Sequence, residues 1–461
     1  MLTRDKAAEL FAKLNKNSSA DETELIISGG KSSLTRFANN SITQNVSEEN
    51  YVLSVRVNME GKTARATTNK FDDDSMLRVV ESAIALARVQ EKDSDLLPMP
   101  DASAFDDKSA SVARAYPETS NLGPAERAQA VGKMVDVAKR HNLTTAGTYS
   151  TAESVEAIFN SKGLSAYHSQ TSAEASVTMI AADSSGWQKA NFPNARDLDP
   201  LELAEIAAKK AKDSAHPKEL APGKYTVILE PAAVLDLVGF MFWDWGGQAI
   251  LDERSFLNNR IGDRVFGENI TITDDVYHPL QNGCPFDGEG VQRRRVPLVE
   301  NGIVKRLVFA RGTAEKIKHS DLAGKVGPVE ATGHGFPIPN EIGEMPANIV
   351  ITGVAGQAET VDQMISETER GILVTRLWYI REVDPYEKML TGMTRDGTFL
   401  VENGRLQYGL FNFRFNESLL HMLSNVEAMS TSVRASGEES FDMVVPAMKV
   451  KDFNFTEVTR F

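Results

Sequence analysis

The chain has few of the residues from which most recognisable catalytic centres are built. It contains one cysteine, Cys284, and seven histidines among 461 residues. One cysteine excludes a disulfide within the chain, which is typical of proteins in a reducing compartment. No histidine is followed by glutamate, and none has a second histidine within five residues. The sequence therefore lacks the paired-histidine helix of hydrolytic zinc sites. It also lacks the CxxC, GxSxG, P-loop and GxGxxG motifs.

Long apolar runs and a surplus of positive charge are missing as well. No stretch reaches 18 uncharged apolar residues, so we expect no membrane span. The N-terminal residues 1–16 are amphipathic and charged throughout, without the apolar region of a signal peptide. With 50 Lys and Arg against 64 Asp and Glu, the net charge of −14 disfavours binding to nucleic acid and to anionic membranes. We expect a cytoplasmic protein.

The length of the chain and the patterns along it indicate a globular α+β protein with several domains. A length of 461 residues is too great for one ordinary core. Segments 1–95 and 124–220 each combine amphipathic helices with alternating strands, and the polar, irregular stretch 96–123 between them is typical of a linker. Segment 221–461 is rich in strands and turns.

Two copies of VENG mark hairpins in this last segment. They lie at 299–302 and 401–404, each between alternating apolar residues. Asn-Gly between two such runs is a strong hairpin signal, because both turn residues must adopt positive φ. The two hairpins suggest one large antiparallel sheet system.

The stretch LEPAAVLDLVGFMF (229–242) predicts a helix that directly follows a strand. Pro231 suits the first helical turn, and one face is apolar at spacings of three and four: Val234, Leu237, Val238 and Met241. A strand leading into a helix is a common place for an active site, yet this helix offers one Asp and no His, Cys, Ser or Lys.

A few other residues are candidates for chemistry, each with a structural alternative. His334 lies between Gly333 and Gly335, where the backbone can pass close to a ligand or form a tight turn. Asp287 and Glu289 in FDGEG are an acid/base pair or solvated turn carboxylates.

Two further candidates carry the same ambiguity. Cys284 has no basic neighbour to lower the pKa of its thiol, so a small buried residue is the simpler interpretation. RLWYIREVDP (376–385), with Arg376, Trp378, Tyr379 and Arg381, is a peptide-binding strand or an ordinary amphipathic one.

A series of motifs, in order along nearly the whole chain, resembles the TldD/PmbA family of DNA gyrase modulators and zinc metallopeptidases. The stretches that carry the resemblance are RFANNSITQNVSEEN (36–50), AIFNSKGLSAYHSQT (157–171), LAPGKYTVILEPAAVLDL (220–237), RSFL (254–257), FDGEGV (286–291), VENGIVKRLV (299–308) and TRLWYIREVDP with LTGMTRDGTFLVENG (375–404). The resemblance implies an N-terminal α/β domain, a middle α+β domain and a large β-rich C-terminal domain of antiparallel sheets.

The resemblance also explains the central helix. In TldD-type members this helix looks like HExxxH, with two zinc-binding histidines, a general base, and a cysteine from the late C-terminal domain. Here Leu235 and Phe240 stand at the histidine places and Asp236 at the glutamate place, and no cysteine follows Cys284. The chain therefore resembles the PmbA/TldE branch, which lacks the metal site. We expect Leu235 and Phe240 to be buried as packing residues.

The resemblance implies a non-catalytic subunit that pairs with a TldD-type HExxxH partner, or with itself, and acts on small or unfolded peptides. It implies no cofactor in this chain and zinc in the partner. His334, Gly333, Gly335, Arg376, Trp378 and Arg381 are the residues expected to hold peptide. One alternative is a self-sufficient hydrolase that uses Asp236, Cys284, Asp287, Glu289 and His334. A second is a gyrase-modulating binding protein, which the charge of −14 disfavours.

Overall fold

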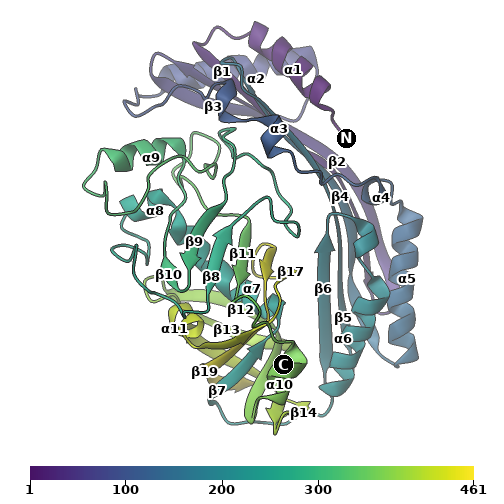
Figure 1. The fold of residues 1–461 in the computed structure, drawn as a ribbon. Helices are drawn as coiled ribbons and strands as arrows, with labels where there is room; N and C mark the ends of the chain where they lie inside the picture. The colour runs from purple at the N-terminus through teal and green to yellow at the C-terminus, as the bar shows by residue number, and fades with distance from the viewer. Residues whose placement is uncertain (461) are drawn as a thin grey trace.

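The computed structural model describes residues 1–460 and confirms the α+β class. The N-terminal half forms one curved sheet of six antiparallel strands in the order β3-β2-β1-β4-β5-β6. Figure 1 shows this sheet curving around the C-terminal half. The strands are β1 (Glu22–Ala38), β2 (Ser41–Met59), β3 (Lys62–Thr68), β4 (Thr144–Asn160), β5 (Ser165–Ile180) and β6 (Ser185–Phe192). Segments 1–95 and 124–220 thus contribute three strands each to a single sheet. The domain boundaries themselves stay a prediction.

Four helices cover one face of this sheet (Figure 1). They are α1 (Arg4–Lys16), α2 (Asp73–Val89), α5 (Pro124–Arg140) and α6 (Pro200–Asp213). Each has an apolar stripe at helical spacing. Each also has at least one basic residue in its last turn, where a positive charge interacts favourably with the helix dipole. The helices form two separate cores on the sheet, one under α1 and α2 and one under α5 and α6.

Residues 96–123, predicted as a linker, run along the sheet as short turns of helix. These are η1 (Ala102–Ala104), α3 (Asp107–Ala110) and α4 (Pro117–Ser120). Met99 and Ala110 are buried. Arg114 donates a hydrogen bond of 3.0 Å to the carbonyl of Gly283, so this segment contacts the C-terminal half.

The C-terminal half contains two sheets rather than one. A six-stranded sheet has the order β10-β9-β8-β11-β18-β17. A seven-stranded sheet has the order β12-β7-β19-β15-β13-β14, and its seventh strand, β16, pairs with β19 beside this path. Because β12 also pairs with β13, five of its strands close into a ring. Most pairs are antiparallel, but β7 with β12 and β11 with β18 are parallel. The remaining strands are β7 (Gly223–Leu229), β8 (Thr271–Asp274), β9 (Val296–Glu300), β10 (Ile303–Val304), β11 (Ile349–Thr352), β12 (Arg370–Asp384), β13 (Met389–Glu402), β14 (Arg405–Gly409), β15 (Asn412–Ser418), β16 (Val426–Met429), β17 (Val433–Ala435), β18 (Met443–Val445) and β19 (Met448–Thr459).

Both VENG hairpins are confirmed, but the inference that they share one sheet is wrong. Asn301 and Gly302 have φ of 48° and 78°, and Asn403 and Gly404 have φ of 51° and 71°. The first turn joins β9 to β10 and the second joins β13 to β14, which lie in different sheets. A turn signal is local, so it specifies the hairpin and not the sheet that the hairpin joins.

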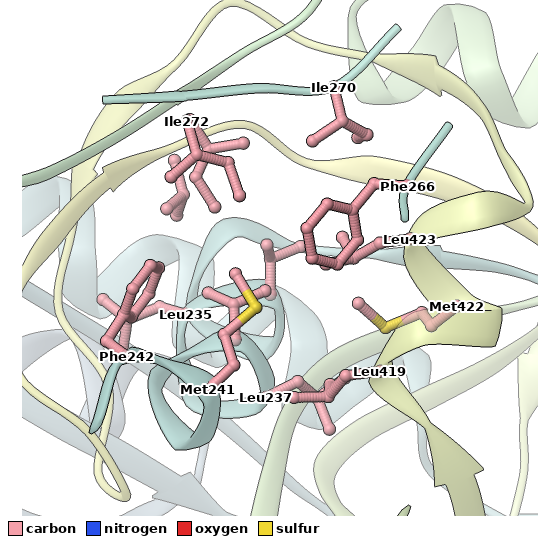
Figure 2. Close-up of a cluster of buried hydrophobic side chains, with 14 of the residues drawn as sticks. Leu235, Leu237, Met241, Phe242, Phe266, Ile270, Ile272, Leu419, Met422 and Leu423 are labelled. Atoms are coloured by element: carbon pink, nitrogen blue, oxygen red, sulfur yellow. The ribbon is translucent and has the colours of Figure 1, made fainter. Parts of the chain in front are cut away.

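The largest core lies between these two sheets, around the central helix. Helix α7 (Pro231–Val238) follows β7 and continues as the 3-10 turn η3 (Gly239–Trp245). Figure 2 shows Leu235, Leu237, Met241 and Phe242 from this segment facing apolar side chains of the surrounding elements. The shorter helices of this half are α8 (Gly247–Leu251), α9 (Arg311–Lys318), α10 (Val361–Ser366) and α11 (Leu419–Ser424), and η2 (Ala195–Asp197) precedes α6. No helix within residues 1–460 combines the length and apolarity of a membrane span.

Candidate functional site

The central helix is a packing element over most of its length. Every residue from 233 to 238 is buried, and Leu235 has no exposed surface. Phe240 departs from the expectation that both residues at the histidine places are buried, because it is only half-buried and packs against the edge of the core. The α-helix tightens to a 3-10 turn at Gly239, which rotates the following side chains away from the positions of a continued α-helix.

Asp236 is the one ionisable side chain on α7, and its carboxylate binds the backbone of a loop near the end of the chain. Its Oδ1 accepts hydrogen bonds from the backbone N–H groups of Glu438, at 3.1 Å, and Glu439, at 2.9 Å. A Cβ at Gly437 would lie 2.2 Å from the same oxygen, so only glycine fits there. Burial raises the pKa of Asp236 to about 7 against the opposing effect of these hydrogen bonds, and the charges of Glu438 and Glu439 raise it further. Asp236 is fully buried and therefore acts as an anchor for the loop.

This late loop, residues 436–441, joins side chains from three other elements. The carboxylate of Glu439 accepts a hydrogen bond of 2.6 Å from the backbone N–H of Tyr379 and lies 3.8 Å from Arg381. Lys189, on β6, donates a hydrogen bond of 2.9 Å to the carbonyl of Gly437. The late loop therefore brings α7, β12 and β6 together.

A shallow aromatic hollow of about 440 Å³ opens beside the late loop. Its apolar lining comes from Phe240, Trp243 and Phe441, and its polar edge from Glu438 and Glu439. The Trp243 side chain is 49% exposed, which is unusual for a residue so large and apolar. We call this hollow and the late loop the candidate site. They lie at the C-terminal end of α7, and the resemblance places the catalytic residues of TldD-type members at this end of the helix.

The strand segment 376–381 divides between the interior and this site. Arg376 is buried: its Nε donates to Asp396 at 2.8 Å, and its guanidinium lies 4.7 Å from the ring of Trp187 and 5.7 Å from that of Trp378. Tyr379 and Arg381 are exposed, and the Arg381 guanidinium lies 4.4 Å from the Tyr379 ring. Of the residues predicted here to hold peptide, Arg381 is the one that lies open beside the candidate site.

His334 lies in the interior, in contact with the buried carboxylate of Asp274. Its side chain has no exposed surface, and its Nε2 is 3.0 Å from Oδ1 of Asp274. Its Nδ1 lies 3.0 Å from the hydroxyl of Thr332. Burial alone would raise the pKa of Asp274, but His334 and the N–H groups that hydrogen-bond to the carboxylate outweigh burial, so the pKa of Asp274 is lowered. The imidazole thus serves as a buried partner of Asp274.

The glycines beside His334 do permit a close approach, and the approach is to the same chain. A Cβ at Gly333 would lie 2.3 Å from the carbonyl oxygen of Gln292. The N–H of Gly335 donates to Oδ2 of Asp287 at 2.8 Å, and a Cβ at Gly335 would lie 2.7 Å from Oε1 of Glu289. The TGHG and FDGEG segments are therefore packed backbone to backbone.

Asp287 and Glu289 are neighbours in the interior of this junction. Oδ1 of Asp287 accepts from the N–H groups of Glu289 and Val291, both at 2.9 Å. Oε1 of Glu289 accepts from the N–H of Arg311 at 3.1 Å. Burial raises the pKa of both carboxyl groups, that of Glu289 to about 7, and the charge of Asp287 adds to the rise at Glu289. The sequence alternative of solvated turn carboxylates does not describe them, since both side chains are buried.

Cys284 packs on the same junction as an apolar residue. It contacts a small cluster that includes Phe105, Ile158 and Phe286, where the FDGEG segment meets the N-terminal sheet. Burial raises the pKa of its thiol, so the thiolate needed for nucleophilic attack is disfavoured. Asp236 contacts the late loop, whereas Asp287, Glu289 and His334 gather at the junction. The hydrolase candidates therefore do not form one constellation.

Sequence reasoning missed Lys189, Trp243, Glu438, Glu439 and Phe441. Glu438 and Glu439 contact a residue 202 and 203 positions earlier, so no local pattern could link them to Asp236. Gly437 is the one local signal, in a stretch that also carries two adjacent glutamates. Within residues 1–460, no three His, Cys, Asp or Glu side chains come close enough together to hold a metal ion.

The comparisons with known proteins agree with the resemblance. Models of the PmbA/TldA metallopeptidase family match in order: domain 1 at residues 23–87, the central domain at 100–215 and the C-terminal domain at 222–457. The metalloprotease PmbA of Escherichia coli O157:H7 is 23% identical over 419 residues, which are 86% of this chain and 85% of that protein.

Solved structures share the fold. TldE from Thermococcus kodakarensis has a TM-score of 0.84 at 19% identity and covers 98% of this chain and 100% of its own. A Thermotoga maritima protein named as a putative modulator of a DNA gyrase has a TM-score of 0.82 at 20% identity. The match covers 98% of this chain and 99% of that protein's chain.

Proposed function

Because the chain belongs to the PmbA/TldD metallopeptidase family, we propose that it is a non-catalytic subunit of a two-component peptidase. In this proposal a homologous HExxxH subunit supplies the zinc and the general base. This chain completes the peptide-binding chamber and stabilises its partner. The substrates are small or unfolded peptides, and the pair works in the cytoplasm.

The observation that carries the proposal is the chemistry of helix α7. Leucine and phenylalanine have no donor atom for zinc, and they stand at positions 235 and 240, where catalytic members are expected to carry histidine. Leu235 is fully buried in the largest apolar core of the molecule. The segment that reaches Asp236 from the end of the chain carries Ser436, Gly437, Glu438 and Glu439, and no cysteine.

The zinc of the family therefore does not fit this chain at the helix. A catalytic zinc site uses about three protein ligands plus a water. The one carboxylate present, Asp236, has the N–H groups of the late loop on Oδ1 and no exposed surface through which water could enter. We accordingly assign no catalytic step to α7 in this chain.

The candidate site offers binding surface instead of catalysis. Aromatic side chains in a hollow can contact the side chains of a peptide, and exposed Arg381 and the carboxylates of the late loop can orient its polar groups. The strand β12 passes directly beside the loop and supplies backbone next to the hollow. A heterodimer is favoured over a homodimer, because two copies of this chain would both lack the zinc ligands at α7.

The alternative of a self-sufficient hydrolase has one supporting observation, the raised pKa values of Asp236 and Glu289 near 7. Such values suit a general acid or base when the group touches substrate. Both groups are buried and hydrogen-bonded to backbone, so this candidate ranks second. The third candidate, a gyrase-modulating binding protein, rests on the name of the Thermotoga relative alone.

Zinc content tests the proposal directly. The purified chain and an HExxxH-bearing family member are dialysed in parallel against trace zinc and analysed by atomic emission. We expect stoichiometric zinc in the HExxxH protein and none above background in this chain. Stoichiometric zinc in this chain that is lost on mutation of Asp236 or His334 would contradict the proposal.

A further inference from the structure

A second cavity lies where the N-terminal sheet meets the C-terminal half. It has a volume of about 540 Å³. One wall is the segment 93–97, which follows α2, and the other is formed by α8, the start of α9 and the segment 336–343. We call it the junction cavity. It is separate from the aromatic hollow, but Phe336, which lines the cavity, stacks on Trp243 of the hollow with a ring separation of 6.3 Å.

The mouth of the junction cavity is acidic. Asp93, Asp95, Asp252 and Glu341 line it and are exposed, against a single exposed base, Lys316. Asp252 is paired with a neighbouring arginine. Within residues 1–460 the other three carboxylates form no ion pair with a Lys or Arg. A cleft lined by charge of one sign concentrates ligands of the opposite sign.

The interior of the cavity contains a carboxylate that is incompletely satisfied. Glu289 lines the cavity with 2% of its surface exposed. Its Oε1 accepts the N–H of Arg311, but its Oε2 accepts no hydrogen bond, and the Arg311 guanidinium lies 3.7 Å from it. A buried carboxylate oxygen without a hydrogen bond is costly, so a donor that enters the cavity gains an interaction that the empty protein lacks.

The remaining walls are apolar. Leu96, Leu97, Phe336 and Ile338 are half-buried in the cavity lining. A ligand that matches both features has a cationic head with several N–H donors and an alkyl stem, because the head can reach carboxylates while the stem lies on hydrocarbon.

We propose that the junction cavity binds an organic cation, a guanidinium or ammonium group on an alkyl chain, with its head at Glu289 and its stem against Leu96 and Leu97. Two sources share this chemistry: a free alkyl amine, and an Arg or Lys side chain of a peptide. The binding itself is independent of the proposed peptidase role. Delivery of a peptide side chain from the aromatic hollow past Trp243 and Phe336 rests on that role.

The charge state of Glu289 makes binding depend on pH. The groups that face it are Asp287, which raises its pKa, and Arg311 and Arg56, which lower it, and burial brings its pKa to about 7. A bound cation favours the ionised carboxylate, so binding near pH 7 releases a proton, and affinity rises as pH increases from 6 to 8.

Isothermal titration of the full chain with agmatine, at low salt and in two buffers of different ionisation enthalpy, tests the proposal. We expect saturable binding with proton release, weakened by added salt. Glu289→Gln should weaken binding at least tenfold. Glu315→Gln is the control, because Glu315 lies on helix α9, which forms part of the cavity wall, but is not itself in the lining. This variant should bind agmatine as the wild type does.

A second variant guards against loss of fold in Glu289→Gln. Gly312 lines the cavity, and a Cβ built on it meets nothing within 4 Å. Gly312→Met should therefore fill the cavity without a clash and abolish agmatine binding at an unchanged thermal midpoint. Equal binding by wild type and both variants would overturn the proposal, as would no binding of agmatine or peptide to wild type.

A second titration separates the two sources. The ligand is a short peptide, blocked at both ends, with one arginine, and its control carries citrulline in place of arginine. Binding of the arginine peptide, lost with citrulline and with Gly312→Met, assigns the cavity to a peptide side chain. Binding of agmatine alone assigns it to a free amine.

Discussion

The core around α7 and the junction of the FDGEG and TGHG segments differ in where they place charge. Around α7 the side chains are apolar, as Figure 2 shows, and Asp236 is the one ionisable side chain of the helix. The junction buries Asp274, Asp287, Glu289 and His334 together. The contrast teaches that the buried carboxylates of this joint are structural, because most of their oxygens accept hydrogen bonds from backbone N–H groups.

The largest effect should come from breaking a buried ion pair near this joint. Glu24 has no exposed surface and binds Arg56 at 2.9 Å and Arg65 at 2.7 Å. Glu24→Ala leaves Arg56 buried without its counter-charge and should lower the free energy of unfolding by about 3–5 kcal/mol. Urea denaturation measures it. The control is Glu205→Ala, which breaks an exposed pair with Arg140 and should cost about 1 kcal/mol or less. Equal costs for the two variants would show that the joint is not held by buried charge.

The core around α7 should respond to lost volume. Leu235→Ala should lower the free energy of unfolding by about 2–5 kcal/mol, because it leaves a cavity in a fully buried apolar site. A stability equal to that of wild type would mean that Leu235 faces an open site, and the packing role of α7 would be wrong.

Asp236 should make the core around α7 sensitive to pH. Its folded pKa of about 7 lies above the usual value near 3.8, so its contribution to stability is greatest below about pH 4 and is lost as pH rises to about 7. Between pH 4 and pH 8, wild type should therefore lose roughly 2–4 kcal/mol relative to Asp236→Asn. Thermal unfolding of both proteins across this range measures the difference. The pKa of Glu289 is raised in both proteins, so its contribution to the pH dependence of stability cancels in the difference between them. Parallel pH profiles would contradict the assignment.

The smallest effect is expected at Phe240. Because this side chain is only half-buried, Phe240→Ala should cost about 1 kcal/mol, near half the transfer energy of a fully buried phenylalanine. Its larger consequence should be on binding, since Phe240 lines the aromatic hollow. A loss of stability as great as that of Leu235→Ala would place Phe240 in the core, as the sequence had suggested.

Local signals in the sequence predicted the elements well. Helices α5 and α6 follow from apolar periodicity and from the proline in the first turn of each, and both VENG hairpins follow from their Asn-Gly turns. Strands β1 and β2, by contrast, extend to 17 and 19 residues around a turn in which Asn39 and Asn40 have positive φ. The polar outer half of this hairpin shows no apolar alternation, so periodicity could not reveal it.

The candidate site was predictable only in part. The absence of zinc ligands at positions 235 and 240 is visible in the sequence once the family pattern is aligned. The exposure of Phe240 depends on the change from α-helix to 3-10 turn at Gly239, which no capping residue announces. The late loop reaches Asp236 across more than 200 residues, and long-range contacts of this kind leave no local pattern.

The most direct test of the account is the cleavage of an unfolded peptide, followed by mass spectrometry, with this chain alone, an HExxxH family member alone, and both together. We predict cleavage that needs both proteins and is abolished by a zinc chelator. Glu205→Ala in this chain should leave cleavage unchanged, because Glu205 forms an exposed pair with Arg140 outside the candidate site. Chelator-insensitive cleavage by this chain alone, lost on Asp287→Ala or Cys284→Ala, would contradict the account and establish a self-sufficient hydrolase.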